Sequence, residues 1–443
     1  MAHSNVTRRK TLKLAAVTAA LPLLHIRTAG AAGKVTAVFT DHFVPASNEL
    51  MRKQIAAWGE ANKVEVQADF LSSQLLMVAA AEKQAGTGHD IMTLPTWEVH
   101  NHAKALVPMD DVVARLTAKF GGLDSTAAYL AQFDGHWMAC PSSVGSQFSG
   151  PLGRISMLKE KAGLDVLAMY PARNERTALA DAWTYEAHLK AAEACHKAGL
   201  PFAIGLGTTA DSANTSGALF AAYGAELVDS KGNITVNSES VRQVLEHAQR
   251  LVRVLPADAA SYDDASNNRA LISGKSALIW NPPSPWAIAR RDAPQIAQDI
   301  WAFPAPSGPK GRFMPTYTNF WGVWNFSRNQ TAAKELIEFL MQRDNVEARC
   351  SAVLGYDIPP FPSMRDFSIW EEAGPPKGAV YNYPVRPHHD AKPHIAGVPA
   401  PPEVAVQIYN RGTMPTMLAK LASGQTVPQV INWATSELEG FLR

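Results

Sequence analysis

VTAVFT at Val35–Thr40 is the first of three apolar runs of strand length, and the others are VEVQADF at Val64–Phe70 and HDIMTL at His89–Leu94. Two helical patterns separate the runs, at Asn48–Asn62 and at the alanine-rich Leu75–Ala85. Strands and helices that alternate in this way form β-α-β units, because two parallel strands need a long crossover, usually a helix. This stretch therefore predicts an α/β fold with a parallel sheet covered by helices.

The rest of the chain continues the alternation. Strands are predicted at 200–206 and 277–280, and helices at 183–197, 216–223, 238–254, 267–272, 331–342 and 428–442. Proline clusters at 282–285, 304–309, 359–362 and 393–402 interrupt these elements. Such clusters are typical of ordered surface connections, and we expect no flexible linker between independent domains.

The first 33 residues predict an export signal. They contain no Asp or Glu, and they carry five basic residues: Arg8, Arg9, Lys10, Lys13 and Arg27. An apolar run at Leu14–Leu24 and a small-residue tail at Ala29–Ala32 follow the basic start, which is the order of a secretory signal peptide. The motif TRRKTLK at Thr7–Lys13 resembles a twin-arginine signal. We expect a periplasmic protein that begins near Lys34 and, with no cysteine near the cleavage point, has no lipid anchor.

Composition excludes several classes of protein. Of 443 residues, 47% are hydrophobic and 18% are charged, so a packed fold is expected and not a disordered chain. Removal of the five basic residues of the export signal leaves 36 basic against 40 acidic residues, a net charge of about −4. This balance argues against nucleic-acid binding. Three cysteines are too few for a disulfide framework, and no apolar run has the length of a membrane span.

Two glycine motifs resemble nucleotide-binding loops only in part. GLGTTA at Gly205–Ala210 matches GxGxxA, but further polar residues are expected before the next helix begins. SGKS at Ser273–Ser276 resembles the end of a phosphate loop, but Arg269 stands where the first glycine belongs. We therefore expect no nucleotide cofactor.

Histidine pairs do not have the spacing of a known metal site. His388, His389 and His394 lie in a proline-rich stretch, and His100 and His102 lie near a helix start. Neither group predicts a metal site on its spacing. The patterns GxSxG and HExxH are absent, so no catalytic residue is predicted. A periplasmic metal-binding protein or enzyme that uses the cluster His388/His389/His394 remains an alternative.

Tryptophans are frequent near predicted strand ends and loops: Trp97, Trp137, Trp280, Trp286, Trp301, Trp321 and Trp324. A flat ring of weak polarity is the surface against which a sugar ring packs. Each tryptophan is equally typical of a core position. Trp183 begins a clear helix, so we expect it in the core or as a packing residue at the start of that helix.

An ordered set of motifs covers nearly the whole chain after the export signal. It consists of DIMTLPTW (90–97), ALVPMDD (105–111), FDGHWMACP (133–141), LKEKAGL (158–164), AWTYEAHLKAAEAC (182–195), YGAELVDSKGNITVNSESV (223–241), ALISGKSALIWN (270–281), AAKELIEFLM (332–341) and SGQTVPQVINWATSELEGFL (423–442). The set resembles the extracellular solute-binding proteins of ABC importers, in the maltose-type or family 1 branch. Gly153-Arg154 departs from the Tyr-Asn pair that the family often has, and the loop at Pro282–Pro285 is longer than usual.

The resemblance implies the class II periplasmic-binding-protein fold, with two α/β lobes, each a mixed sheet flanked by helices, joined by hinge crossings. Lobe one is expected at 34–141 and 316–362, and lobe two at 142–315 and 363–443. A monomer of this kind closes on a solute by hinge bending and docks on an ABC permease in the inner membrane. It performs no turnover and needs no cofactor.

The resemblance also implies the solute contacts: Asp41, His42, Ser73 and Trp97 from lobe one, Asp211, Asn214 and Trp286 from lobe two, and Tyr317, Asn319, Trp321 and Tyr356 from the hinge-side return. Trp286 aligns with a family tryptophan that packs on sugar. Asp41 and Asp211 would accept hydrogen bonds from hydroxyl groups, and a helix cap or a solvated loop acid is the alternative role for each.

The expected solute is a carbohydrate or a polyol. A phosphorylated polyol, a polyamine or another small charged solute remains an alternative, because a fold does not determine its ligand. Arg154 and Arg386 are the candidates to bind an anionic group.

Overall fold

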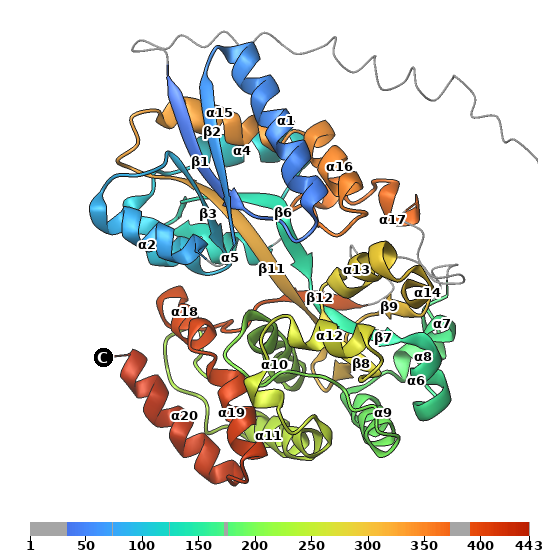
Figure 1. Ribbon diagram of the computed structural model, residues 1–443. Coiled ribbons are helices and arrows are strands. Elements are labelled where there is room, and N and C mark those ends of the chain that lie inside the picture. Colours follow the sequence, from blue (N-terminus) through green and yellow to red (C-terminus); the bar gives the residue numbers. More distant parts are fainter. Residues whose placement is uncertain (1–32, 73, 124, 172–175, 373–389, 443) are drawn as a thin grey trace, which may run out of the picture.

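The computed structural model of the chain describes residues 33–442, apart from 73, 124, 172–175 and 373–389 (Figure 1). The predicted twin-arginine motif lies outside the described residues, as do Ser73, Arg386, His388 and His389. None of the helices in the described ranges combines the length and the apolar composition of a membrane span.

The parallel sheet predicted near the N-terminus is confirmed. β1 (Lys34–Thr40) lies between β2 (Glu65–Leu71) and β3 (Ile91–Pro95) and is parallel to both. α1 (Pro45–Asn62) and α2 (Leu75–Ala85) make the two crossovers. β1 has buried side chains on both faces, as expected for a strand that is covered by helices on each side.

β11 (Gly311–Val323) connects the two halves of the molecule (Figure 1). In the upper half of the figure it pairs antiparallel with β3 and with β6 (Cys140–Phe148). Its first residues pair with β10 (Ser307–Gly308) and β12 (Ala391–His394). β6 and β11 therefore form a hydrogen-bonded crossing between the halves, and its register shifts between Tyr317 and Asn319.

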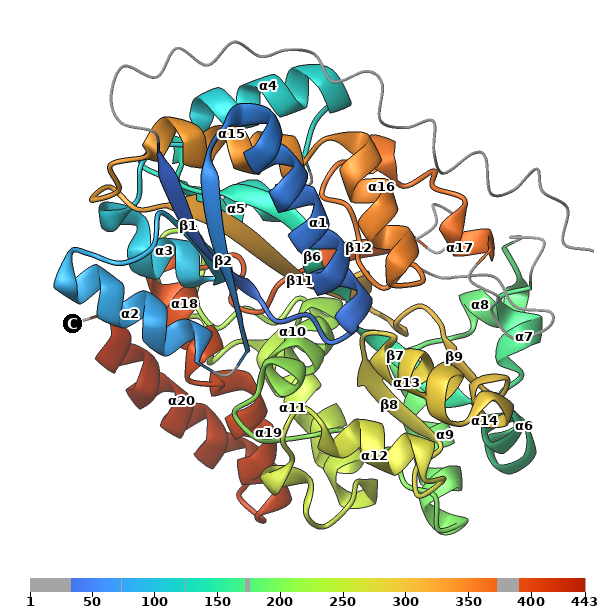
Figure 2. The same cartoon turned by 45° about the horizontal axis from the view of Figure 1, so that its top comes forward.

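The upper half consists of β1, β2, β3 and the helices around them. Besides α1 and α2 these are α3 (Glu98–His102), α4 (Asp110–Phe120), α5 (Ser125–Ala131), α15 (Gln330–Leu340), α16 (Arg343–Ala352) and α17 (Ile369–Glu372). α1 packs beside α15 and α16 (Figure 2). The segment at 330–372 therefore returns to the N-terminal sheet although it is far away in sequence.

The lower half contains a small antiparallel sheet. β7 (Gly150–Arg154) lies between β8 (Leu278–Asn281) and β9 (Ile300–Ala302). The prediction of a strand at 200–206 is wrong. Ala203 N donates to the Leu278 carbonyl oxygen (2.9 Å), but Pro201 has no amide hydrogen and Ile204 N turns back to Phe202, so no ladder forms along β8.

Helices fill the rest of the lower half. They include α6 (Ile155–Ala162), α9 (Tyr185–Lys197), α10 (Ala210–Tyr223), α11 (Glu239–Leu251), α12 (Ser266–Ile272), α13 (Ser284–Asp292), α18 (Pro402–Asn410), α19 (Thr413–Ala422) and α20 (Val427–Phe441). α10 packs against α11 and α19. Its close approach to the chain after β12 depends on Gly217, where a Cβ atom would lie 2.5 Å from that of Ala396.

α10 begins earlier than the predicted start at residue 216. Thr209 caps it, because its hydroxyl oxygen accepts a hydrogen bond from Ser212 N (3.2 Å). The polar residues after GLGTTA are therefore part of the helix and not a loop. The core position predicted for Trp183 is confirmed: its side chain is buried, and Nε1 donates to the Pro304 carbonyl oxygen (2.9 Å).

Candidate functional site

Tyr356 packs against the loop that follows β1. Its ring lies edge-on to His42, with 5.3 Å between the ring centroids, and is stacked on Phe43 at 6.3 Å. Burial is the main cause that raises the pKa of Tyr356, and the Gln147 side chain beside its hydroxyl opposes the rise. Two of the predicted contacts, His42 and Tyr356, are thus brought together, and Gln147 of β6 joins them.

A buried ion pair supports this loop. His42 Nε2 lies 2.8 Å from Asp357 Oδ1, and Gly145 N donates to the same oxygen (3.0 Å). Burial lowers the pKa of His42, but the charge of Asp357 and its hydrogen bond outweigh burial, so the pKa is raised above its usual value. The second oxygen of Asp357 is buried and has no hydrogen-bond partner. The pair ties the end of β1 to the crossing strand β6.

Three polar side chains meet where the halves face each other. Thr96 follows β3, Asn214 lies in α10, and Tyr409 lies in the last turn of α18. Thr96 and Asn214 lie close enough to the Tyr409 hydroxyl to lower its pKa, which burial raises. The Thr96 and Tyr409 hydroxyls and the side-chain oxygen of Asn214 are buried, and none makes a hydrogen bond of normal geometry. These side chains face one another, and a buried polar cluster of this kind is unusual, so a functional reason for it is expected.

The backbone at Thr96 is strained. Its φ of +47° lies in the left-handed region, which a β-branched residue rarely adopts. Strain of this kind costs about 1–3 kcal/mol and collects at ligand sites. It turns the chain at the end of β3, where Thr96 N donates to the Thr318 carbonyl oxygen of β11 (2.7 Å).

β6 and β11 contribute amide oxygens. Asn319 Nδ2 donates to the Val144 carbonyl oxygen (2.9 Å), and Gln147 Nε2 donates to the Gly145 carbonyl oxygen (3.2 Å). Carbonyl oxygens only accept, so these bonds settle the orientation of both amides. Asn319 Oδ1 and Gln147 Oε1 are buried and have no partner. Tyr317 lies opposite Gln147 in the strand register.

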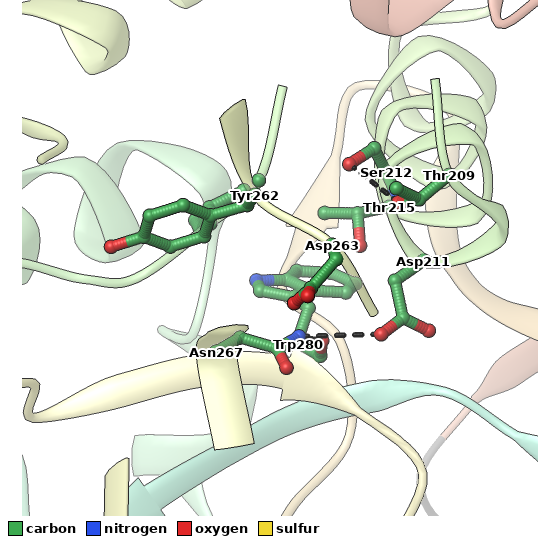
Figure 3. A pocket seen from close by; sticks show the side chains of 10 residues that line it. Thr209, Asp211, Ser212, Thr215, Tyr262, Asp263, Asn267 and Trp280 are labelled. Atoms are coloured by element: carbon green, nitrogen blue, oxygen red, sulfur yellow. Dashed lines mark hydrogen bonds between the residues drawn. The ribbon is translucent and has the colours of Figure 1, made fainter. Parts of the chain in front are cut away.

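Asp211 borders a small cavity in the lower half (Figure 3). Its Oδ2 accepts a hydrogen bond from Asn267 Nδ2 (3.3 Å), and its backbone N donates to Asp264 Oδ1 (3.3 Å). Burial, and secondly the charge of Asp264, raises the pKa of Asp211 to about 8. Tyr262 and Trp280 also line the cavity, whose volume of about 10 Å³ is roughly that of one water-sized sphere.

The charge of Asp211 connects this cavity with the tyrosines. Burial is the largest cause of the raised pKa of Tyr317, Tyr356 and Tyr409, and the negative charge of Asp211 acts on all three hydroxyls. These groups therefore share one electrostatic environment between the halves. We call the region the central site, formed by Thr96, Gln147, Asp211, Asn214, Tyr317, Asn319, Tyr356 and Tyr409.

Three predicted tryptophans pack elsewhere. Trp97 is buried, donates from Nε1 to the Ala396 carbonyl oxygen (3.3 Å) and lies edge-on to Tyr129. Trp286 of α13 is 1% exposed and lies edge-on to Trp301, with 5.5 Å between the centroids. Trp321 is equally buried and meets Phe39 at 5.4 Å. All three are held in side-chain packing, so a solute reaches them only if their surroundings move.

The remaining candidates are accounted for by local contacts. Asp41 is exposed and accepts a hydrogen bond from Asn48 Nδ2 (2.6 Å). Arg154 is paired with Asp299, with 2.8 Å between Nε and Oδ2. His394 lies edge-on to Phe313, and burial lowers its pKa to about 4. No group of three or more potential metal-ligating side chains occurs within the ranges that the structure describes.

The contacts predicted from the sequence do not include Thr96, Gln147, Tyr409 or Asp357. Thr96 adjoins the predicted Trp97, so the end of β3 pointed to the correct loop. Tyr409 belongs to an amphipathic helix whose apolar face is buried, and nothing in that pattern separates it from a core tyrosine.

Hydrogen bonds behind the central site join the two halves directly. Besides the bond from Trp97 to Ala396, the Tyr129 hydroxyl donates to the Ala400 carbonyl oxygen, and Asn410 Nδ2 donates to Glu98 Oε1 (3.1 Å). We call these three bonds the inter-half contact. This contact places α3 and α5 of the upper half against the segment that precedes α18 and against the last residue of α18.

Comparison with protein families matches residues 53–375 to a family described as bacterial extracellular solute-binding protein. No curated protein sequence matches the chain significantly.

Solved structures with the same fold are numerous. The maltose-bound MalE3 of T. maritima has 18% sequence identity and a TM-score of 0.70, covering 93% of this chain and 100% of its own. A sugar transporter protein of Arthrobacter chlorophenolicus A6 with bound laminaribiose has 15% identity, the same TM-score and the same coverage. The sugar-binding protein MalE of Xanthomonas citri has 14% identity and a TM-score of 0.70, covering 92% of this chain and 97% of its own. The predicted α/β binding-protein fold, with sheets flanked by helices, is confirmed; the large sheet is mixed, and the small sheet of the lower half is antiparallel.

Proposed function

We infer the function from the premise that this chain belongs to the bacterial extracellular solute-binding protein family. Such a protein is the solute-binding component of an ABC transporter and catalyses no reaction. We propose that the solute is a carbohydrate or a polyol, bound in the central site and delivered to a permease in the inner membrane. The observation that carries this proposal is the cluster of buried hydroxyl and amide groups at Thr96, Asn214 and Tyr409, which face one another and have no hydrogen bond of normal geometry.

These groups match the chemistry of a sugar hydroxyl. A hydroxyl group donates one hydrogen bond and accepts others, so it pairs with an amide oxygen, a carboxylate or another hydroxyl. Tyr317 and Tyr356 add aromatic surface for the apolar face of a sugar ring. The structural neighbours named above were solved with maltose or laminaribiose, or are described as sugar-binding, which supports the same class of solute.

Binding requires the halves to move. The cavity beside Asp211 holds no more than a water-sized group, so a sugar ring enters only when the halves separate. The β6–β11 crossing provides the hinge, and the solute bridges the halves as they close. We propose lobe one at 34–141 and 316–362 and lobe two at 142–315 and 363–443. Within the second range of lobe two, α17 is an exception to these bounds: Trp370 Nε1 donates to the Gly355 carbonyl oxygen (3.1 Å), so α17 packs on lobe one.

We also propose that the protein is exported by the twin-arginine route and acts as a monomer without a lipid anchor. The export route rests on the basic motif TRRKTLK and the apolar run after it. Replacement of both Arg8 and Arg9 by Lys is expected to leave the precursor in the cytoplasm, as measured by fractionation and immunoblotting. Normal periplasmic accumulation of that variant would contradict the route.

The solute class is tested by thermal unfolding and calorimetry with a panel of sugars and polyols. At least one of them is expected to raise Tm, and Tyr409→Phe is expected to weaken its binding about 10–100-fold by removing one hydroxyl from a site that is closed to water. Asp229→Asn, on an exposed turn of the lower half, is the matched control and is expected to bind normally. Stabilisation by phosphorylated polyols or by zinc alone, with no response to any sugar, polyol or amine, would overturn the proposal.

A further inference from the structure

Two neighbouring carboxyl groups at the central site have no cationic partner among the described residues. Asp211 and Asp264 lie next to each other, and neither has a cationic side chain within ion-pair distance in the described part of the chain. Asp263 also borders the cavity, but Arg269 Nη2 lies 3.1 Å from its Oδ1 and neutralises it. Among the described residues that line the cavity there is no lysine, arginine or histidine. A partly buried carboxyl group in such surroundings is held largely as the neutral acid at neutral pH, and a bound cation would favour its ionised form.

The unpartnered atoms of the site are mainly acceptors. Asn319 Oδ1, Gln147 Oε1 and Asn214 Oδ1 are buried amide oxygens without partners, and Asn214 follows Asp211 by three residues on the same face of α10. The Thr96 and Tyr409 hydroxyls can either donate or accept. The site therefore favours a ligand that donates more hydrogen bonds than it accepts, and an ammonium group donates three and accepts none.

The cavity also has the size and the aromatic wall for such a group. Trp280 stacks on Tyr185 at 6.4 Å with an interplanar angle of 11°, and it lines the cavity together with Tyr262 (Figure 3). A cation over an indole face gains about 0.5–2 kcal/mol. An ammonium group is about the size of a water molecule, which is what a volume of about 10 Å³ admits.

We propose that the solute carries a protonated amino group beside its hydroxyl groups, as an amino sugar or amino polyol does, and that this group binds Asp211 against the ring of Trp280. The inference rests on the proposed function and specifies its substrate class. Asp211 lies in the first turn of α10, where the helix dipole adds to the ammonium group in favouring the ionised form of the carboxyl group. The ammonium group then supplies the counter-charge that the chain lacks.

The test is calorimetric titration of the purified protein at neutral pH with matched sugars: D-glucosamine, N-acetyl-D-glucosamine and D-glucose, and the corresponding galactose series. One of the two amines is expected to bind at least about tenfold more tightly than its acetylated and neutral counterparts. Asp211→Asn, which is nearly isosteric, should abolish this preference. Asp264→Asn, on an exposed turn, is a second variant that should reduce it, and Asp229→Asn, which does not line the cavity, is the matched control that should retain it.

The outcomes separate the two proposals. Neutral sugars that bind as tightly as the amines, or a preference that survives in both Asp211→Asn and Asp264→Asn, would overturn the ammonium subsite and leave the sugar proposal intact. Binding of spermidine without binding of any sugar or polyol would overturn the sugar proposal. It would support the ammonium subsite if Asp211→Asn abolishes the binding of spermidine.

Discussion

Gly145 in the crossing strand β6 cannot carry a side chain without two separate costs. Its φ is +72°, and a Cβ atom would lie 2.5 Å from Asn319 Nδ2. The left-handed backbone costs an alanine about 1–2 kcal/mol. Displacement of Asn319 also removes its bond to the Val144 carbonyl oxygen, which contributes about 1 kcal/mol. Gly145→Ala is therefore expected to lower the free energy of unfolding by about 2–3 kcal/mol.

The assay is equilibrium denaturation in urea, with Gly163→Ala as the matched control. Gly163 has a similar φ of +65°, but a Cβ atom at this position would have no neighbouring atom within 4 Å, so only the backbone cost applies. The two variants should differ by about 1 kcal/mol or more, and Asn319→Ala should remove most of that difference in a double-mutant cycle. Equal destabilisation of both variants would refute the reasoning that Gly145 makes room for Asn319.

Three further predictions concern buried titratable groups. His42→Gln should destabilise the protein more at about pH 5.5 than at about pH 9. Because Asp357 raises the pKa of His42, the stability that the pair contributes is complete below the unfolded pKa and is lost as pH rises through the folded pKa. A difference in urea denaturation that does not depend on pH would contradict this. His247→Leu should reduce the loss of stability on acidification by up to about 3 kcal/mol. Burial lowers the pKa of His247 to about 4, so stability falls as pH drops from the pKa of the unfolded chain toward this folded pKa. An unchanged acid-denaturation profile would count against the lowered pKa. The three cysteines are buried and free, so a thiol reagent should label the native protein only on unfolding, and rapid native labelling would show that one is accessible: Cys140, Cys195 and Cys350.

The sheet near the N-terminus could be predicted from sequence because its signals are local. The runs at 35–40 and 64–70 have strand length and are separated by helices of the correct length. The start of α10 could not be placed, because the polar run at 211–216 has no clear helical period and only the Thr209 cap marks the boundary. The apolar run at 200–206 predicts a strand that does not form, because apolarity alone does not show whether neighbouring amides form a ladder.

The central site was predictable only in part. The ends of β1 and β3 pointed to His42 and to the neighbourhood of Thr96, since ligands of α/β sheets lie beyond the carboxyl ends of strands. Tyr409 and Gln147 reach the site through long-range packing, and no local pattern marks such residues. Tryptophan is ambiguous for the opposite reason: the same side chain suits a sugar ring and a core, and Trp286 and Trp321 are buried against Trp301 and Phe39.

The inter-half contact has a consequence for affinity. Its bonds at Trp97, Tyr129 and Glu98 stabilise the arrangement in which the halves meet whether or not a solute is present. The apparent affinity is the intrinsic affinity multiplied by the fraction of molecules that are in the binding-competent form. Substitutions at this contact therefore provide a means of tuning the effective dissociation constant, and with it the ease of solute release, without altering a residue of the central site.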